Sequence, residues 1–284
     1  MSKQQRFTLT GESVDDFTNW LVGEERASAT IEKYTRDLQA FVLWSDGKEA
    51  TKKSAAQYKR ELAELKKPAT VNSAIAALNA YFIFMRWDIK LKPLKIQKQT
   101  FRREEKELTR AEYERLLQAT RAKGNNRLHL ILQAICSTGI RVSELQYITV
   151  EAARSGQATI TNKGKTRTIF LPKKLTAALL HYAKQRGISS GCIFITKTGK
   201  PIDRRDIWAS MKKLCATAKV DPSKVFPHNL RALFAREFYS KHKDVVRLAD
   251  TLGHSNMETT RTYTMESGAI HRRLIEKLDL VIGL

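Results

Sequence analysis

Apolar side chains between residues 12 and 87 recur three and four positions apart, which is the spacing of one face of an α-helix. Ser13 and Ser28 stand shortly before acidic residues, and Pro68 precedes the last apolar group; these are typical positions for helix starts. Such helices must bury their apolar faces against one another. The sequence therefore predicts an all-helical N-terminal bundle of four helices, with apolar groups at residues 17–21, 31–42, 58–65 and 71–85.

The second part of the chain keeps helical spacing and adds one stretch with the alternation of β-strands. Thr109 is an expected N-cap because Glu112 follows three positions later. In residues 158–171 two β-prone runs flank Asn162-Lys-Gly-Lys165, which predicts a hairpin with a basic turn. The expected fold class is mainly α (α+β): the bundle plus a mostly helical domain with a small antiparallel sheet. Its later helices are expected at residues 173–185, 204–219, 230–241, 243–252 and 267–278.

Residues 91–107 separate these two patterns. Apolar periodicity is lost there, Pro93 interrupts the segment, and charged side chains crowd it. These features are typical of a linker, and 284 residues are enough for two domains with separate cores. We therefore expect a helical domain at 1–95, a linker at 96–107 and a second domain at 108–284.

The chain is strongly basic, with 51 Lys and Arg against 29 Asp and Glu and a formal net charge of +22. The excess is concentrated after residue 100, where 34 basic side chains accompany 17 acidic ones. A basic excess of this size fits a polyanionic partner. Charge alone is compatible with nucleic acid, an anionic membrane surface or an acidic protein.

The sequence argues against several classes of protein. No apolar run approaches the ~20 residues of a membrane span, and residues 1–13 lack the apolar core of a signal peptide. We therefore expect a cytoplasmic protein with no membrane partner. The cysteines are odd in number, widely spaced and set among apolar neighbours, which favours buried thiols over disulfides or a zinc site: Cys136, Cys192 and Cys215.

Four short segments combine chemically able side chains with constrained backbone positions. In TGIRVSEL, residues 138–145, Arg141 begins a new helix after a glycine and can be braced by Glu144 one turn along. In the hairpin turn, Lys163 or Lys165 can reach a phosphate as a mobile charge or proton donor. Taken singly, a capped helix junction and a solvated turn are the ordinary interpretations.

The other two segments lie further along the chain. PHNLR, residues 227–231, places His228 and Arg231 three positions apart on one helical face, at a helix N-terminus suited to an anion. In LGHSNMETTRTYT, His254 lies in a turn and Tyr263 follows nine residues later on a short helix. Taken alone, the His228 and Arg231 pattern could occur by chance, and Tyr263 could be an ordinary packing residue.

Together, in this order and spacing, the four segments resemble the motifs of the tyrosine recombinase (phage integrase) family, especially its Xer-like members. SATIEKYTRDLQAFVLW at 28–44 is also similar to the core-binding domain of that family, so the resemblance covers nearly the whole chain. It implies a core-DNA-binding domain at 1–95 and a catalytic domain at 108–284 that ends in an exchange helix.

The resemblance also implies a role for individual residues: nucleophile for Tyr263, phosphate binding for Arg141 and Arg231, completion of the phosphate cradle for His228 and His254, general acid for Lys163, and support for Glu144. Lys165, on the same turn, is the alternative to Lys163 as general acid. Where many relatives have a second histidine after the arginine of the HxLR motif, this chain has Ala232.

These residue types suit the transfer of a phosphodiester to a phenol. Two arginines supply bidentate donors for the non-bridging oxygens, where charge develops in the transition state. A tyrosine of intrinsic pKa about 10 needs a base such as histidine, and the departing 5′ hydroxyl needs a proton, which a lysine can supply. No Asp and Glu cluster with metal-ligand spacing accompanies them, which disfavours a two-metal nuclease, and we expect no metal and no other cofactor.

The leading hypothesis is a site-specific recombinase that cleaves and rejoins duplex DNA through a 3′-phosphotyrosine intermediate, for integration or excision, inversion, or resolution. One alternative is a type IB topoisomerase-like nicking and closing enzyme; the other is a DNA-binding accessory protein that has lost catalysis. The expected partners are double-stranded DNA with a specific recombination site and a homo-tetramer on that DNA, alone or with a paralogous recombinase, at the nucleoid.

Two further expectations concern DNA and subunit contacts. The two domains and the basic linker would clamp a duplex, and polar helix faces near Lys33, Arg36, Asn72 and Asn79 are candidates for DNA contacts or an ordinary solvated surface. Residues 267–278 and the apolar residues 280–284 need a hydrophobic pocket. The family resemblance favours docking on a neighbouring protomer over packing in cis. No extra N-terminal domain precedes the bundle, so we expect no binding to separate arm sites.

Overall fold

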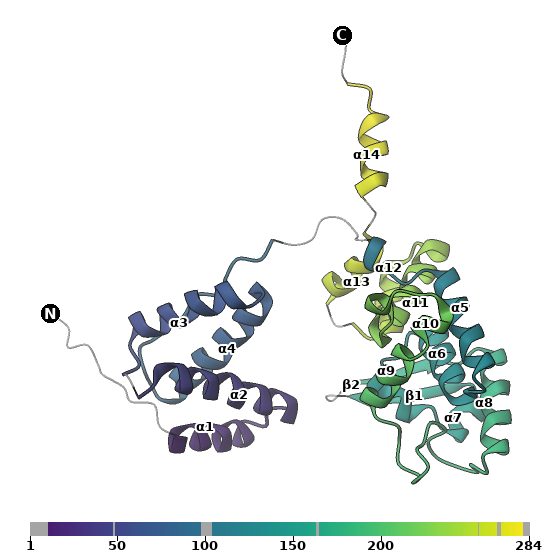
Figure 1. Ribbon diagram of the computed structural model, residues 1–284, viewed down its shortest axis with the longest axis horizontal. Coiled ribbons are helices and arrows are strands. Elements are labelled where there is room, and N and C mark those ends of the chain that lie inside the picture. The colour runs from purple at the N-terminus through teal and green to yellow at the C-terminus, as the bar shows by residue number, and fades with distance from the viewer. Residues whose placement is uncertain are drawn as a thin grey trace. The chain divides into compact units, whose positions relative to one another are not determined.

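The computed structural model describes residues 11–47, 49–97, 104–162, 165–254, 256–265 and 268–280. The chain divides into two compact units, Met1–Lys98 and Gln99–Leu284 (Figure 1). Each unit has its own hydrophobic core. The division falls within the segment predicted as a linker. Among the described residues, no helix is both long and apolar enough to cross a lipid bilayer.

The first unit contains the four predicted helices: α1 (Gly11–Gly23), α2 (Ser28–Ser45), α3 (Lys52–Leu65) and α4 (Pro68–Phe84). Pro68 occupies the first turn of α4, as predicted, because its missing N–H would have no partner there anyway. Aromatic rings fill the core between the helices, and Phe17 meets Tyr81 edge to face with ring centroids 5.4 Å apart. These large rings give a small bundle much of its buried apolar area.

An extended segment after α4 belongs to the first unit, although it has no helical or strand structure of its own. The Asn79 side chain donates to the Leu91 carbonyl over 2.9 Å and accepts from the Leu91 N–H over 2.8 Å. Asn72 makes the same pair of bonds with Leu94, over 2.9 and 2.7 Å. The sequence pattern did not predict this role, in which the amide groups of the asparagines replace the backbone partners that this segment lacks.

The second unit is mostly helical with one two-stranded antiparallel sheet, so the predicted fold class is confirmed. Strands β1 (Gln157–Asn162) and β2 (Lys165–Phe170) pair from Gln157 opposite Phe170 to Asn162 opposite Lys165. The helical elements are η1 (Glu104–Lys106), α5 (Arg110–Ala122), α6 (Asn126–Thr138), η2 (Val142–Tyr147), α7 (Val150–Ser155), α8 (Lys173–Gln185), α9 (Arg204–Lys212), α10 (Cys215–Ala218), η3 (Pro222–Lys224), α11 (Pro227–His242), α12 (Val245–Leu252), α13 (Met257–Thr264) and α14 (Gly268–Glu276).

Several predicted boundaries in this unit are corrected. The expected helix 204–219 is two helices, α9 and α10, and the helix expected from Leu230 begins at Pro227. The helix expected from Lys243 begins at Val245, since Lys243 ends α11 with φ 53° in the left-handed region. The structure confirms Thr109 as the N-cap of α5, where its side chain accepts from the Glu112 N–H.

The core of this unit surrounds α6, which packs against α5, α8 and α11. Of the three cysteines, Cys215 is buried, whereas Cys136 and Cys192 are only partly buried; for these two the prediction of buried thiols was too strong. Burial raises the pKa of the Cys136 thiol to about 12, which leaves it protonated and unreactive at neutral pH.

Gly139, which ends α6, is the position where we predict the sharpest loss of stability on a small substitution. Its φ is 67°, and a Cβ there would lie 2.6 Å from Cδ1 of Phe234. Gly156 has φ 75° but no neighbour within 4 Å of the same position, so it is a matched control. Gly156→Ala is expected to lose about 1 to 2 kcal/mol for the left-handed backbone alone. Gly139→Ala should lose more, because the Phe234 ring must also move.

Chemical denaturation of both alanine variants measures the difference. Equal losses of unfolding free energy in the two variants would show that the contact with Phe234 carries no cost.

Candidate active site

Five of the predicted site residues line one open pocket of about 440 Å³ in the second unit. Arg141 comes from the junction of α6 and η2, His228 and Arg231 from the first turns of α11, His254 from the turn after α12, and Tyr263 from the end of α13. The structure therefore brings together segments that are up to 122 residues apart in the chain, as the separation of Arg141 and Tyr263 shows.

The two candidate lysines belong to the hairpin. Lys163 lies outside the described residues. Lys165 is the first residue of β2 and pairs through its backbone with Asn162.

Hydrogen bonds to Glu144 and to the Gly253 carbonyl hold the Arg141 side chain in place. Its Nη1 donates to Oε1 of Glu144 over 3.0 Å, which is the predicted ion pair, and its backbone N–H donates to Oε2 over 2.9 Å. Its Nη2 donates to the Gly253 carbonyl over 3.3 Å. The Glu144 side chain is 2% exposed. Arg141 precedes a 3-10 helix instead of the expected α-helix, and this tight turn lets Glu144 reach back to it.

Arg231 is buried, with 3% of its surface exposed, and both Nη atoms of its guanidinium group have hydrogen-bond acceptors. Its Nη1 donates to the Gly139 carbonyl, and its Nη2 donates to the Leu252 carbonyl over 2.7 Å. Burial, aided by the charge of Arg141, lowers the pKa of Arg231 to about 10, so the guanidinium stays cationic at neutral pH. The Arg141 and Arg231 guanidinium groups line the same pocket and donate to the carbonyls of Gly253 and Leu252, which are adjacent in the chain. Two such groups can bind the two non-bridging oxygens of a phosphate.

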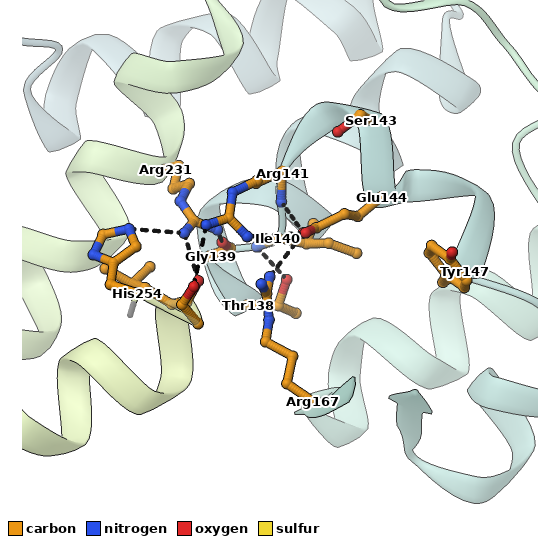
Figure 2. A network of polar contacts seen from close by, with 12 residues as sticks. Thr138, Gly139, Ile140, Arg141, Ser143, Glu144, Tyr147, Arg167, Arg231 and His254 are labelled. Carbon is orange, nitrogen blue, oxygen red and sulfur yellow. Dashed lines mark hydrogen bonds and ion pairs between the residues drawn. The ribbon is translucent and has the colours of Figure 1, made fainter. Parts of the chain in front are cut away.

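His254 is bonded at both ring nitrogens. Its Nε2 lies 3.2 Å from Nη2 of Arg231, and its Nδ1 lies 2.9 Å from the Thr260 hydroxyl (Figure 2 shows the first contact). A guanidinium can only donate, so Nε2 must be the acceptor and Nδ1–H donates to Thr260. Burial, and then the charges of Arg231 and Arg141, lower the pKa of His254 to about 4. The ring is therefore neutral at physiological pH.

Tyr263 lies close to both histidine rings. The centroid of His254 is 6.1 Å from that of Tyr263 and stacked on it, and the centroid of His228 is 6.3 Å away on a tilted ring. Burial raises the pKa of Tyr263, whereas the charge of Arg231 opposes that rise. Burial and the two arginines lower the pKa of His228, which keeps a neutral imidazole beside the phenol.

Two residues of this arrangement had no place in the prediction from sequence: Arg167 and Thr260. Arg167 on β2 donates from Nη2 to Oε2 of Glu144 over 2.7 Å. Arg167 lies two residues before buried Ile169, so the two side chains share the inward face of the strand. A charged residue at an inward-facing position needs a polar partner, and this is the signal that could have identified it. Thr260 is fully buried three residues before Tyr263, on the same face of α13.

The pKa of His254 gives a prediction about stability. Between pH 6.5 and about 4 the unfolded chain binds a proton at this residue that the folded chain does not bind. The free energy of unfolding is therefore expected to decrease as the pH falls through this window. Urea denaturation at several pH values should show a shallower decrease for His254→Gln than for the wild type.

The exposed His181, on α8, supplies the control, and His181→Gln should follow the wild-type pH dependence. An unchanged slope in His254→Gln would contradict the prediction. His228 contributes in the same direction and remains in both variants.

Comparison with known proteins agrees with this geometry. Residues 106–268, more than half of the chain, match the model of the phage integrase family. The tyrosine recombinase XerA of Pyrococcus furiosus is 28% identical over 290 residues, covering 98% of this chain and 97% of that protein. The tyrosine recombinase XerD of Listeria innocua is 26% identical over 277 residues, covering 88% of this chain and 93% of that protein.

Solved structures show the same fold. A lambda integrase dimer bound to a COC′ core site superposes with a TM-score of 0.71 at 18% identity, over 92% of this chain and 97% of that one. The XerH site-specific recombinase bound to a palindromic difH substrate superposes with a TM-score of 0.70 at 20% identity, over 88% and 79%. Because the family model matches more than half of the chain and the curated relatives are Xer recombinases over nearly its whole length, the chain belongs to the phage integrase family as a Xer-like tyrosine recombinase.

Proposed function

We propose that this protein is a site-specific recombinase that cleaves and rejoins duplex DNA through a 3′-phosphotyrosine at Tyr263. The observation that carries the proposal is the convergence of two arginines, two neutral histidines and a buried tyrosine on one open pocket. A phenol, cationic donors and a neutral base are the groups that transfer of a phosphodiester to tyrosine requires.

In the proposed cleavage step the Tyr263 oxygen attacks phosphorus, a new phosphorus–oxygen bond forms, and the bond to the 5′ oxygen breaks. The phenol proton passes to the neutral His228, because the one acceptor nitrogen of His254 is already bonded to Arg231. The 5′ oxygen takes a proton from Lys163, with Lys165 as the alternative donor. Arg141 and Arg231 hold the non-bridging oxygens as charge builds on them. The covalent bond keeps the energy of the phosphodiester, so rejoining is the same reaction in reverse.

The proposed partner is double-stranded DNA with a specific site. The basic excess of residues 101–284 supports it, since lysine and arginine contacts with phosphates supply most non-specific affinity for DNA. Two structural neighbours, XerH and lambda integrase, were solved bound to DNA sites, which also supports a DNA substrate. We propose that the first unit is a core-DNA-binding domain, that the second is catalytic, and that the enzyme acts at the nucleoid in the cytoplasm.

The proposed assembly on DNA is a homo-tetramer in which α14 docks on a neighbouring protomer. Its support is the row of exposed apolar side chains on and after this helix: Ile270, Leu274, Ile275 and Leu278. A truncation after Gly268 is the direct test, followed by gel filtration with and without DNA. Loss of the large complex on DNA supports exchange of the helix, and unchanged assembly contradicts it.

The function is tested with a library of duplexes that carry a randomised core and a nick just 3′ of each candidate cleavage position. Cleavage then releases a short 5′-hydroxyl fragment that diffuses away, which traps the protein on the DNA. Covalent complexes formed in EDTA are purified under denaturing conditions, and their DNA is sequenced to identify the site. Absence of any covalent complex would overturn the proposal.

Two intact copies of the captured site then distinguish the enzyme classes. A recombinase exchanges strands between copies placed on fragments of different length. An enzyme of the topoisomerase type relaxes a supercoiled circle without producing recombinant fragments.

A further inference from the structure

Arg167 is a partly buried cation that contacts Glu144 and does not line the pocket. Its side chain is 16% exposed, and its Nε has no hydrogen-bond partner among the described residues. Burial lowers the pKa of Arg167, and the nearby charge of Arg141 acts in the same direction, whereas Glu144 opposes them. A guanidinium that costs this much to bury needs a compensating role.

The contacts of Arg167 converge on the two groups that hold Arg141. Its Nη2 donates to Glu144 over 2.7 Å, and Glu144 in turn accepts from the Arg141 guanidinium over 3.0 Å (Figure 2). Its stem packs against Gly253, whose carbonyl accepts from Arg141 over 3.3 Å. The packing is close enough that a Cβ on Gly253 would lie 2.6 Å from Cδ of Arg167. Arg167 therefore contacts both residues that accept hydrogen bonds from the Arg141 guanidinium group, Glu144 and Gly253.

Sharing of Glu144 also decides how much positive charge the pocket offers. With Arg167 present, one carboxylate is divided between two guanidinium groups, and Arg141 keeps part of its charge free. Without Arg167, the buried carboxylate would be left with Arg141 as its one guanidinium partner. In a poorly solvated setting that tighter pair would draw Arg141 toward Glu144 and neutralise it.

We propose that Arg167 is a positioning residue that keeps Arg141 placed and charged for the scissile phosphate by sharing the Glu144 carboxylate and by packing under Gly253. The inference rests on the proposed function of Arg141. The alternative is that Arg167 merely ties the β-hairpin to η2, and the two differ in what happens when Glu144 is also changed.

The test uses the captured site in single-turnover cleavage, with DNA affinity and melting temperature measured beside it. Arg167→Met is expected to slow formation of the covalent complex about 10- to 100-fold, as loss of a supporting contact does elsewhere, with little change in DNA affinity. Arg167→Lys keeps the charge and should fall between that variant and the wild type. In Arg167→Met with Glu144→Gln, cleavage should be faster than in Arg167→Met alone, because the unshared negative charge is gone.

Lys224→Met is the matched control. It removes a similarly shielded cation, 17% exposed, from a carboxylate of the same unit, Glu112 at 3.0 Å, and Lys224 does not line the pocket. It should lower the melting temperature without slowing cleavage. The inference would be overturned if Arg167→Met cleaved DNA at the wild-type rate. It would also be overturned if the double variant cleaved no faster than Arg167→Met. Failure of the wild type itself to form a covalent complex would instead overturn the proposed function.

Discussion

Replacing Tyr263 by phenylalanine is expected to abolish the covalent protein–DNA complex while leaving DNA binding intact. The substitution removes one oxygen atom, and the ring can keep its contacts with the rings of His254 and His228. No phosphorus–oxygen bond can then form, so the loss should be complete at every pH. Denaturing gels of the reaction with nicked DNA measure the covalent complex, and gel shifts measure binding.

Tyr239 on α11 supplies the control for this variant, since it packs against the apolar cluster that includes Tyr263 but does not line the pocket. Tyr239→Phe should form the covalent complex at the wild-type rate. A covalent complex that persists in Tyr263→Phe would show that another side chain is the nucleophile.

Arg231→Lys is expected to reduce the cleavage rate by a factor on the order of 10² to 10³, the cost of losing one preorganised donor to a developing oxyanion. Lysine keeps the positive charge but not the planar fork of five N–H donors. A single ammonium cannot reach the carbonyls of Gly139 and Leu252 and the His254 ring while also binding a phosphate. Because Arg231 is buried, the freed carbonyls would also lower stability.

Arg236→Lys separates the chemical effect from the structural one. Arg236 lies on the same helix, has 13% of its side chain exposed, donates to the Leu108 carbonyl over 2.7 Å and does not line the pocket. Its charge acts on the pKa of Tyr263, and lysine keeps that charge. That variant should lose stability but retain the cleavage rate, measured well below its melting temperature. If Arg231→Lys cleaved DNA at the wild-type rate, a positive charge alone would suffice at this position.

The helices were predictable because their signals are local. Apolar spacing, Pro68 at the start of α4 and the Thr109 cap all act within one or two turns, so a short window of sequence contains them. Boundaries failed where a tertiary contact or a backbone turn intervened. The split between α9 and α10 and the left-handed Lys243 have no counterpart in the apolar pattern.

The roles of polar side chains were harder to predict, because their partners lie far along the chain. Asn72 reaches Leu94, 22 residues away, and Arg167 reaches Glu144 across 23 residues. A sequence pattern indicates that such a residue is polar. It does not indicate whether the polar group meets solvent, DNA or an orphaned backbone carbonyl.

The sequence by itself determined the two-part organisation, the helical class with one hairpin, and five of the residues that line the pocket. The tertiary structure alone decided how these residues are held: Arg231 by the carbonyl of Gly139, 92 residues away, His254 in its Nδ1–H form by Thr260, and Arg141 by a carboxylate shared with Arg167. The physical reason is that residue type sets which bonds a group can make, whereas burial and the approach of distant backbone decide which bonds it does make.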